Sequence, residues 1–164
     1  MKKLFFIVGI LISFKSIAQS NAETTQYFLV RHAEKQVDGT KNPHLTKEGF
    51  KRAAQWANAL KYYKIDAVYA TDYYRTKETA QPVAKANNVT ITSYHPHNID
   101  YKKFMSDTKG KKVVVVGHSN TIPNFVNKLI GKDKYKELSE KVYGNFYIVT
   151  LNKDGSINDI VLNF

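Results

Sequence analysis

Four residues that can handle a phosphoryl group stand at or shortly beyond the ends of short apolar runs: Arg31, His32, Arg75 and His118. A forked guanidinium group matches a phosphate dianion better than an ammonium group does. A neutral imidazole held between arginines can attack phosphorus, because histidine is among the side chains that form covalent intermediates. Each residue alone is most often a structural or surface group, but the four together predict a site for phosphoryl chemistry.

These residues would meet if the apolar runs are strands of one parallel sheet. The run 113–116 consists of four valines, which is typical of a strand covered on both faces. The runs 27–30 and 67–70 and, more weakly, 89–94 predict further strands. Open α/β sheets bind ligands beyond the carboxyl ends of their strands, so this edge of the sheet is the predicted site. Arg75, in the first turn of the following helix, would be assisted by the positive helix end.

Amphipathic segments between the runs predict helices. Thr46 can cap the first helix, whose expected apolar face consists of Phe50, Ala53, Ala54, Ala57 and Leu60. Thr71 or Asp72 can cap the helix that contains Arg75. Pro123 fits the start of the last helix, and Gly131 ends it.

The segments 146–151 and 157–162 flank the turn residues 152–156 and predict a hairpin at the sheet edge. The alternation of strands and helices before that hairpin is typical of the α/β class. We therefore expect a three-layer α/β/α sandwich with a mainly parallel central sheet and a C-terminal edge hairpin.

The first residues have the three-part layout of a secretory signal peptide. Lys2 and Lys3 precede the apolar run 4–14, and small residues follow up to Ala18. The run is shorter than the roughly 20 residues of a membrane-spanning helix. We expect residues 1–18 to be removed, with cleavage after residue 22 as the alternative. The remaining domain, 19–164, would be periplasmic or secreted, without stable membrane insertion.

The composition narrows the classes of function. The chain has 164 residues, 24% charged and 43% hydrophobic, which excludes a disordered protein. It has no cysteine, so disulfides, thiol nucleophiles and thiolate metal sites are excluded. The formal charge of +11 favours an anionic ligand. The lysines are scattered and no nucleic-acid-binding motif is present, so we expect no nucleic-acid partner.

Four ordered motifs resemble those of the histidine phosphatase superfamily, which has the phosphoglycerate-mutase-like fold. The motifs are Leu29-Val30-Arg31-His32-Ala33-Glu34-Lys35, Leu45-Thr46-x-x-Gly49, Ala70-Thr71-Asp72-x-x-Arg75-x-x-x-Thr79-Ala80 and Val116-Gly117-His118-Ser119-Asn120. Ala33 stands where the family has glycine, and Thr71 where it has serine. The resemblance extends from about Tyr27 to Leu151, and the short phosphohistidine-phosphatase-like branch is closest in size.

The resemblance implies that His32 accepts the phosphoryl group and that Arg31, Arg75 and His118 complete the phosphate pocket. Ser119, next to His118, is a further candidate phosphate-binding residue. No metal and no other cofactor is implied. The family usually keeps a carboxylic proton donor after the third strand, where Asp100 is the nearest carboxylate. Glu34, two residues after His32, is the second candidate for this role and Asp72 is the third. A proton donor must come within hydrogen-bond distance of the leaving oxygen.

Two other enzyme chemistries fit less well. The stretch around Ser119 resembles the nucleophile elbow of serine hydrolases, but no histidine follows it to complete the triad in the order of that fold. His95 and His97 could hold a metal, yet two imidazoles without a third ligand are more often part of a surface loop. We therefore expect a metal-independent phosphomonoester hydrolase that acts on a small phosphorylated substrate through a phosphohistidine on His32. The alternative is a catalytically silent module of the same fold that binds phosphorylated ligands.

Overall fold

The computed structural model describes residues 24–164, so the expected signal peptide and both cleavage positions lie outside the described residues. The elements in chain order are β1 (Thr25–Arg31), α1 (Lys47–Ala59), β2 (Ala67–Ala70), α2 (Tyr74–Asn87), β3 (Ile91–Ser93), α3 (Tyr101–Asp107), β4 (Lys112–Gly117), α4 (Thr121–Ile130), β5 (Asn145–Leu151) and β6 (Ile157–Asn163). Among these residues, no helix is both long and apolar enough to cross a membrane.

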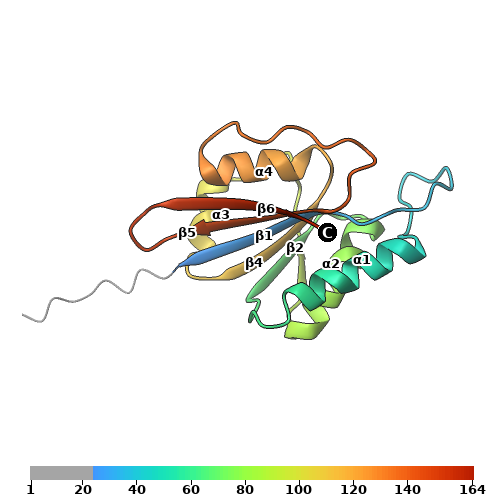
Figure 1. Cartoon of the computed structure of the whole chain (residues 1–164), viewed down its shortest axis with the longest axis horizontal. Helices are drawn as coiled ribbons and strands as arrows, with labels where there is room; N and C mark the ends of the chain where they lie inside the picture. Colours follow the sequence, from blue (N-terminus) through green and yellow to red (C-terminus); the bar gives the residue numbers. More distant parts are fainter. Residues whose placement is uncertain (1–23) are drawn as a thin grey trace, which may run out of the picture.

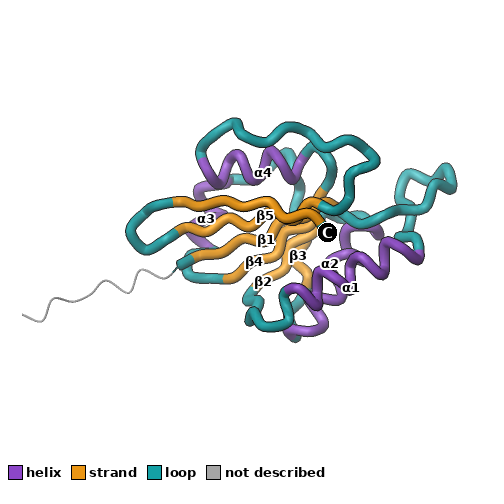
Figure 2. The backbone as a smooth tube through the Cα atoms, viewed as in Figure 1, coloured by secondary structure: helices purple, strands orange, loops and turns teal. Residues whose placement is uncertain are grey.

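The strands form one six-stranded sheet in the order β3-β2-β4-β1-β5-β6. The pairs β2–β3, β2–β4 and β1–β4 are parallel, while β5 runs antiparallel to both β1 and β6. The predicted hairpin is therefore confirmed as the antiparallel edge of a mainly parallel sheet (Figure 2). The carboxyl ends of β1, β2 and β4 lie next to one another, as the site prediction requires.

Helices cover both faces of the sheet, which confirms the predicted three layers (Figure 1). Alternate residues of β1 explain this arrangement, because successive side chains of a strand point to opposite faces. Phe28 and Val30 pack in the core beneath α1 and α2, whereas Tyr27 and Leu29 pack in the core beneath α4. The valines of β4 alternate in the same way, so the run 113–116 is buried on both sides.

The first helix differs from the prediction in the face that it buries. Thr46 caps α1 as expected, and its hydroxyl oxygen accepts a hydrogen bond from the Gly49 backbone nitrogen at 3.1 Å. Phe50, expected to face the core, is 48% exposed, and Trp56 is buried in its place. Ala53 and Leu60 are buried as predicted and Ala57 packs against the core, whereas Ala54 is exposed. The helical period was therefore right, and the buried face is turned from Phe50 and Ala54 towards Gly49 and Trp56.

The start of α2 also differs from the prediction. Tyr73 is the residue before the helix, and it makes no side-chain capping bond. Thr71 is not a cap because its hydroxyl donates to Thr76 within the site. Asp72 instead forms an ion pair with Lys77, the fourth residue of α2.

Three smaller differences concern the element bounds. The short helix α3 was not predicted, and none of its residues is fully buried. The third strand is shorter than the predicted 89–94. The last helix begins at Thr121, two residues before the expected Pro123, and ends as predicted at Gly131, whose φ is 66°.

Candidate functional site

The carboxyl edge of the sheet brings the two arginines and two histidines together. Arg31 is the last residue of β1, His118 directly follows β4, and Arg75 is the second residue of α2. The ring centroids of His32 and His118 are 5.5 Å apart. Residues separated by as many as 87 positions therefore meet because parallel strands end at the same edge.

His32 is held in the tautomer that a nucleophile needs. Its ring is 3% exposed, and Nδ1 lies 2.8 Å from the backbone carbonyl oxygen of Ala33. A carbonyl oxygen can only accept, so Nδ1 carries the hydrogen and Nε2 has the free lone pair. Burial, together with the nearby charges of Arg31 and Arg75, lowers the pKa of His32 to about 3, although the bond to Ala33 opposes this shift. The imidazole is therefore neutral at ordinary pH.

The backbone around His32 is tied to both neighbouring elements. The His32 nitrogen donates to the Gly117 carbonyl oxygen at 2.9 Å, which joins it to the end of β4. The Ala33 nitrogen donates to the Thr79 hydroxyl at 3.0 Å, and that hydroxyl donates to the Arg75 carbonyl oxygen at 2.6 Å. Thr79 therefore fixes the loop that contains His32 against the helix that carries Arg75. Its role was not predicted, although it lies in one of the four motifs.

The segment after His32 also contacts the start of α1. A Cβ atom on Gly49 would collide with the backbone carbonyl oxygen of Glu34, so only glycine allows this approach. The Glu34 carboxylate accepts from Arg52 Nε at 2.9 Å and from Arg52 Nη2 at 2.7 Å. Burial alone would raise the pKa of Glu34. The hydrogen bonds from Arg52 and the charges of Arg52 and Arg31 together outweigh burial, so the pKa of Glu34 is lowered. Glu34 thus joins two segments.

The segment 132–144 connects α4 to β5 (Figure 1). We call it the α4–β5 segment, and it contacts the side chain of Arg31. This side chain is 1% exposed. Nη1 donates to the carbonyl oxygens of Ser139 and Val142 at 3.1 and 3.0 Å, and Nη2 donates to the Glu140 carboxylate at 2.6 Å. The ring of Tyr143 lies 4.2 Å from its guanidinium carbon. Arg31 therefore anchors this segment across the end of β1.

Ser119 shares the same carboxylate. Its hydroxyl donates to Glu140 at 2.6 Å, and this bond, together with the charge of Arg31, lowers the pKa of Glu140 against the opposing effect of burial. Glu140 was not predicted, because nothing in its local sequence distinguishes it from other surface glutamates. Ser119, a predicted phosphate-binding residue, is thus placed beside Arg31 with its hydroxyl hydrogen already donated.

Arg75 has a different environment from Arg31. Its guanidinium carbon lies 4.3 Å from the ring centre of Tyr73, and among residues 24–164 its buried Nε and Nη1 have no hydrogen-bond partner. Burial is the main cause that lowers the pKa of Arg75. A buried guanidinium with unpartnered donors is costly unless it meets an anion. This arrangement is suited to binding a phosphate group.

His118 is oriented by a chain of hydroxyl groups. Thr76 donates its hydroxyl hydrogen to the backbone carbonyl oxygens of Thr71 and Tyr73, at 2.7 and 2.9 Å, so its oxygen can accept from Thr71 at 3.1 Å. The Thr71 oxygen in turn accepts from Nε2 of His118 at 2.9 Å. Burial and then the charges of Arg75 and Arg31 lower the pKa of His118 to about 4. A bound anion would offset these charges and favour the imidazolium form.

A cavity of about 470 Å³ opens over Arg75 and His118. Its remaining lining comes from the ends of β2, β3 and β4: Thr71, Asp72, Tyr73, Tyr94, His95, Pro96, His97, Asn120 and Thr121. Arg31 and His32 do not line it but lie buried beside it, His32 in contact with the His118 ring and 6.1 Å from the ring of Tyr143.

Neither of the two favoured proton-donor candidates lines this cavity. Asp100 is exposed at the start of α3, where its carboxylate accepts from the Lys103 nitrogen at 3.0 Å as a helix cap. Glu34 is bound by Arg52. Asp72, the third candidate, does line the cavity, with its carboxylate paired to Lys77.

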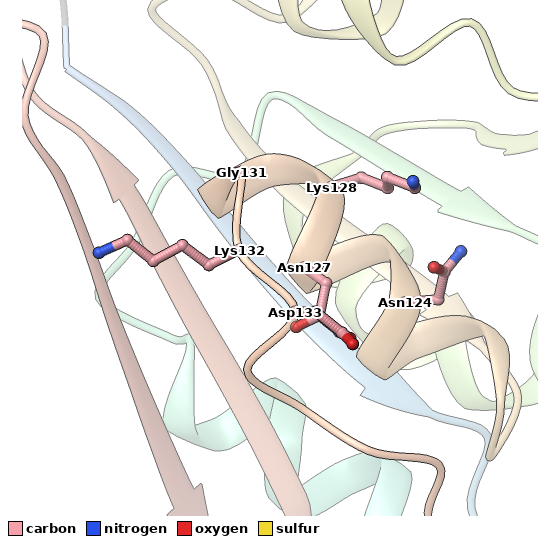
Figure 3. Close-up of a pocket in the computed structure, with 6 residues that line it drawn as sticks. All are labelled: Asn124, Asn127, Lys128, Gly131, Lys132 and Asp133. Carbon is pink, nitrogen blue, oxygen red and sulfur yellow. The ribbon is translucent and has the colours of Figure 1, made fainter.

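A separate hollow of about 340 Å³ lies at the C-terminal end of α4, away from the four residues (Figure 3). Asn127 and Asp133 lie together in it, while Lys128 and Lys132 extend to opposite sides. The Asn127 amide nitrogen donates to Asp133 and to the Tyr135 carbonyl oxygen, and its oxygen accepts from the nitrogens of Lys134 and Tyr135. These groups are occupied in holding the α4–β5 segment.

The described part of the chain contains no cluster of three or more His, Asp or Glu side chains that could hold a metal ion. The rings of His95 and His97 are 6.0 Å apart between centroids, on the loop after β3. The structure therefore offers two imidazoles at this point and no third ligand among residues 24–164.

Comparison with known proteins places these observations in a family context. Residues 27–95 match the model of the histidine phosphatase superfamily (branch 1), a segment that contains Arg31, His32 and Arg75. No curated protein sequence matches the chain. The predicted resemblance to this superfamily is confirmed by the family match and by the folds of similar solved structures.

Three of these structures show how far the likeness extends. The protein histidine phosphatase SixA complexed with tungstate has a TM-score of 0.66 at 18% identity, covering 84% of this chain and 96% of that one. A mycobacterial glucosyl-3-phosphoglycerate phosphatase has a TM-score of 0.59 at 11% identity, with 87% and 99% covered. A phosphoglycerate mutase from Bacillus anthracis has a TM-score of 0.63 at 12% identity, with 86% and 93% covered. At these identities the likeness establishes the fold alone.

Proposed function

We propose that this chain, with the fold of the histidine phosphatases and a branch 1 segment that includes Arg31, His32 and Arg75, is a metal-independent phosphomonoester hydrolase. His32 Nε2 attacks phosphorus in line and the alcohol leaves, which gives a phosphohistidine. Water then attacks the phosphohistidine and releases inorganic phosphate, which restores neutral His32. In the transition state of each step, negative charge is spread over the three oxygens of the transferred phosphoryl group. Fixed positive charge near these oxygens stabilises that transition state.

The observation that carries this proposal is the state of His32. A histidine can act as a nucleophile only with a free lone pair, and the bond from Nδ1 to the Ala33 carbonyl oxygen leaves that lone pair on Nε2. The pKa of about 3 keeps this nitrogen unprotonated at every pH at which the folded protein would act.

The surrounding groups support the same chemistry. Arg75 has two buried nitrogens without a partner among the described residues, and these donors can bind phosphate oxygens. His118 becomes a donor on both nitrogens once an anion favours its protonation. Arg31 contributes its charge from behind His32, with its Nε also unpartnered among residues 24–164.

The substrate class follows from the cavity. A volume of about 470 Å³ can hold a phosphate group and a small organic part. The similar structures include proteins named for a phosphohistidine and for glucosyl-3-phosphoglycerate, so this fold serves phosphoryl groups on both nitrogen and oxygen. We propose a small phosphorylated substrate for this chain. The signal-peptide pattern of residues 1–18 supports export, so the substrate would be met in the periplasm or outside the cell.

A second candidate function is favoured by one specific observation. His32 is 3% exposed and does not line the cavity, so a ligand bound to Arg75 and His118 need not reach it. A catalytically silent module that binds phosphorylated ligands would have these properties. The two functions differ in whether phosphate esters are turned over.

The experiment that separates them is a panel of phosphate esters assayed with the mature protein, in the presence and absence of EDTA. The proposed enzyme hydrolyses p-nitrophenyl phosphate and at least one small metabolite ester, at rates that EDTA does not change, because arginine and histidine supply the positive charge. Loss of activity in EDTA and its return with a divalent ion would contradict metal independence. Binding of tungstate without turnover of any ester would favour the binding module.

A further inference from the structure

The loop after β3 presents imidazoles to the cavity at the place where a carboxylate was expected. His95 and His97 both line the cavity together with Arg75 and His118. Both side chains are exposed, and among residues 24–164 neither has a hydrogen-bond partner within the protein. Imidazole is also the side chain that most readily gives and takes protons near neutral pH.

The proposed reaction needs such a group. When an alcohol leaves phosphorus it departs as an alkoxide unless a proton reaches its oxygen, and the nucleophile and the arginines cannot supply that proton. Asp100 and Glu34 lie outside the cavity, bound to the start of α3 and to Arg52. Asp72 is paired with Lys77, and the pKa of Glu140 is lowered by its hydrogen bond to Ser119 and the charge of Arg31. Each carboxylate near the site is therefore already bound to a donor or a cation.

The backbone holds His97 in a defined place. The Asn98 nitrogen donates to the His95 carbonyl oxygen at 3.1 Å, which closes a four-residue turn. Pro96 is the second residue of this turn, the position where its fixed φ is most favourable, and His97 is the third. His97 is thus presented by a restrained turn over the cavity.

We propose that His97 is the general acid of this site, and that it protonates the leaving oxygen while His32 attacks phosphorus. This proposal rests on the proposed function. His97 is preferred to His95 because it lies at the tip of the turn, whereas His95 lies at the base of the turn, two residues after the end of β3. The titratable and charged groups that share the cavity with it are Asp72, Tyr73, Arg75, Tyr94, His95 and His118.

The proton balance closes over the two steps. In the first step the His32 Nε2–phosphorus bond forms, the phosphorus–oxygen bond breaks, and the imidazolium of His97 gives its proton to the departing oxygen. The products are the neutral alcohol, phosphohistidine and neutral His97. In the second step neutral His97 takes a proton from the attacking water, the nitrogen–phosphorus bond breaks, and phosphate leaves. His97 is again protonated, and His32 is neutral.

The test compares two substrates of similar shape and different leaving ability. p-Nitrophenyl phosphate expels a stable phenolate, whereas phenyl phosphate expels a much more basic one that needs the proton. General acid catalysis is worth about 10²- to 10⁴-fold, so His97→Gln should lower kcat/KM for phenyl phosphate by about 10²-fold or more. The loss for p-nitrophenyl phosphate should be several-fold at most. The basic limb of the kcat–pH profile for phenyl phosphate should also disappear in the variant.

His95→Gln is the matched control, since it changes the other imidazole of the same turn and should change kcat/KM for the two substrates by the same factor. Equal losses on both substrates in His97→Gln, no loss on either, or a selective loss in His95→Gln would overturn the assignment of His97. Formation of phosphohistidine on His32 by the wild-type protein keeps the proposed function standing in each of those cases. Absence of both turnover and phosphohistidine in the wild type would overturn the proposed function, and the assignment of His97 with it.

Discussion

The two arginines of the site have the same side chain but opposite surroundings. Arg31 is 1% exposed and donates to two backbone carbonyl oxygens and to the Glu140 carboxylate, all from the α4–β5 segment. Arg75 stacks on the ring of Tyr73 and keeps two buried nitrogens without a partner among the described residues. One guanidinium is largely satisfied by the protein, and the other is largely unsatisfied.

This difference indicates that the two arginines have different roles in the site. A buried guanidinium that already has protein acceptors gains less from a phosphate than one that has none, because unpaired buried donors carry the larger desolvation penalty. We therefore expect Arg75 to be the main anion-binding arginine, and Arg31 chiefly to hold the α4–β5 segment. The charges of both arginines contribute to the lowered pKa of His32.

The largest effect on activity is expected from substitution of His32. His32→Ala removes the proposed nucleophile, and loss of a covalent catalytic residue costs at least about 10³-fold in kcat. Binding of tungstate should remain within several-fold of the wild type, because Arg75 and His118 are unchanged. Steady-state kinetics with p-nitrophenyl phosphate and calorimetry with tungstate measure the two quantities. Retained turnover in His32→Ala would remove His32 from the mechanism.

Exchanging each arginine for methionine tests the comparison itself. Arg75→Met should lower kcat/KM by about 10²- to 10³-fold, the usual effect of removing one donor from a transition-state anion, with little change in the free energy of unfolding. Arg31→Met should also lower activity, and in addition it should destabilise the fold by about 1–3 kcal/mol, because the Ser139 and Val142 carbonyl oxygens lose their donor.

Kinetic assays and urea unfolding of both variants provide the measurement. If Arg75→Met is the more destabilised protein, or if Arg31→Met alone loses tungstate binding, the roles assigned to the two arginines are contradicted.

A smaller effect is expected from pH. Burial and the nearby arginines lower the pKa of His32 to about 3 and that of His118 to about 4, while an unfolded histidine titrates near 6.5. Between pH 6.5 and about 4 the unfolded chain therefore binds more protons at these positions than the folded chain. The free energy of unfolding should fall as the pH is lowered through this range. Urea unfolding at several pH values should show a shallower fall in His32→Asn, and an unchanged slope would contradict the neutral state of His32.

The smallest effect is expected at Asp100. Its carboxylate caps α3 and does not line the cavity, and asparagine is about as good a cap as aspartate. Asp100→Asn should therefore leave both activity and stability close to those of the wild type. Parallel kinetics on phenyl phosphate and p-nitrophenyl phosphate check this. A selective loss on phenyl phosphate would restore Asp100 as a proton donor and contradict its placement at the helix cap.

Much of the fold could be predicted from the sequence because its signals are local. The valines of β4 indicate a buried strand, and the ends of three apolar runs indicate one edge of the sheet, where the structure brings Arg31, His32, Arg75 and His118 together. The expected cap of α2 was wrong because tertiary contacts compete for the Thr71 hydroxyl, which joins Thr76 and His118. Local capping preference is weak beside such contacts.

Other features carry no local signal at all. The contact between Arg31 and Glu140 joins residues 109 positions apart, and it depends on how the irregular α4–β5 segment folds back over β1. The short helix α3 has no fully buried residue and hence no clear apolar period. Asp100 was chosen for its position after the third strand, but the turn around Pro96 places His97 at the cavity and leaves Asp100 to begin α3.

The most direct test of the account is to trap the phosphoryl group on His32. Wild-type protein is mixed with ³²P-labelled phenyl phosphate, quenched in alkali within milliseconds, and analysed for protein-bound label by peptide mapping. If His32 is the phosphoryl acceptor, the label is stable in alkali and lost in acid. It is confined to the peptide that contains His32, and it is absent from His32→Ala. Turnover with no label on any histidine, or label on His118 or His97, would contradict this role of His32.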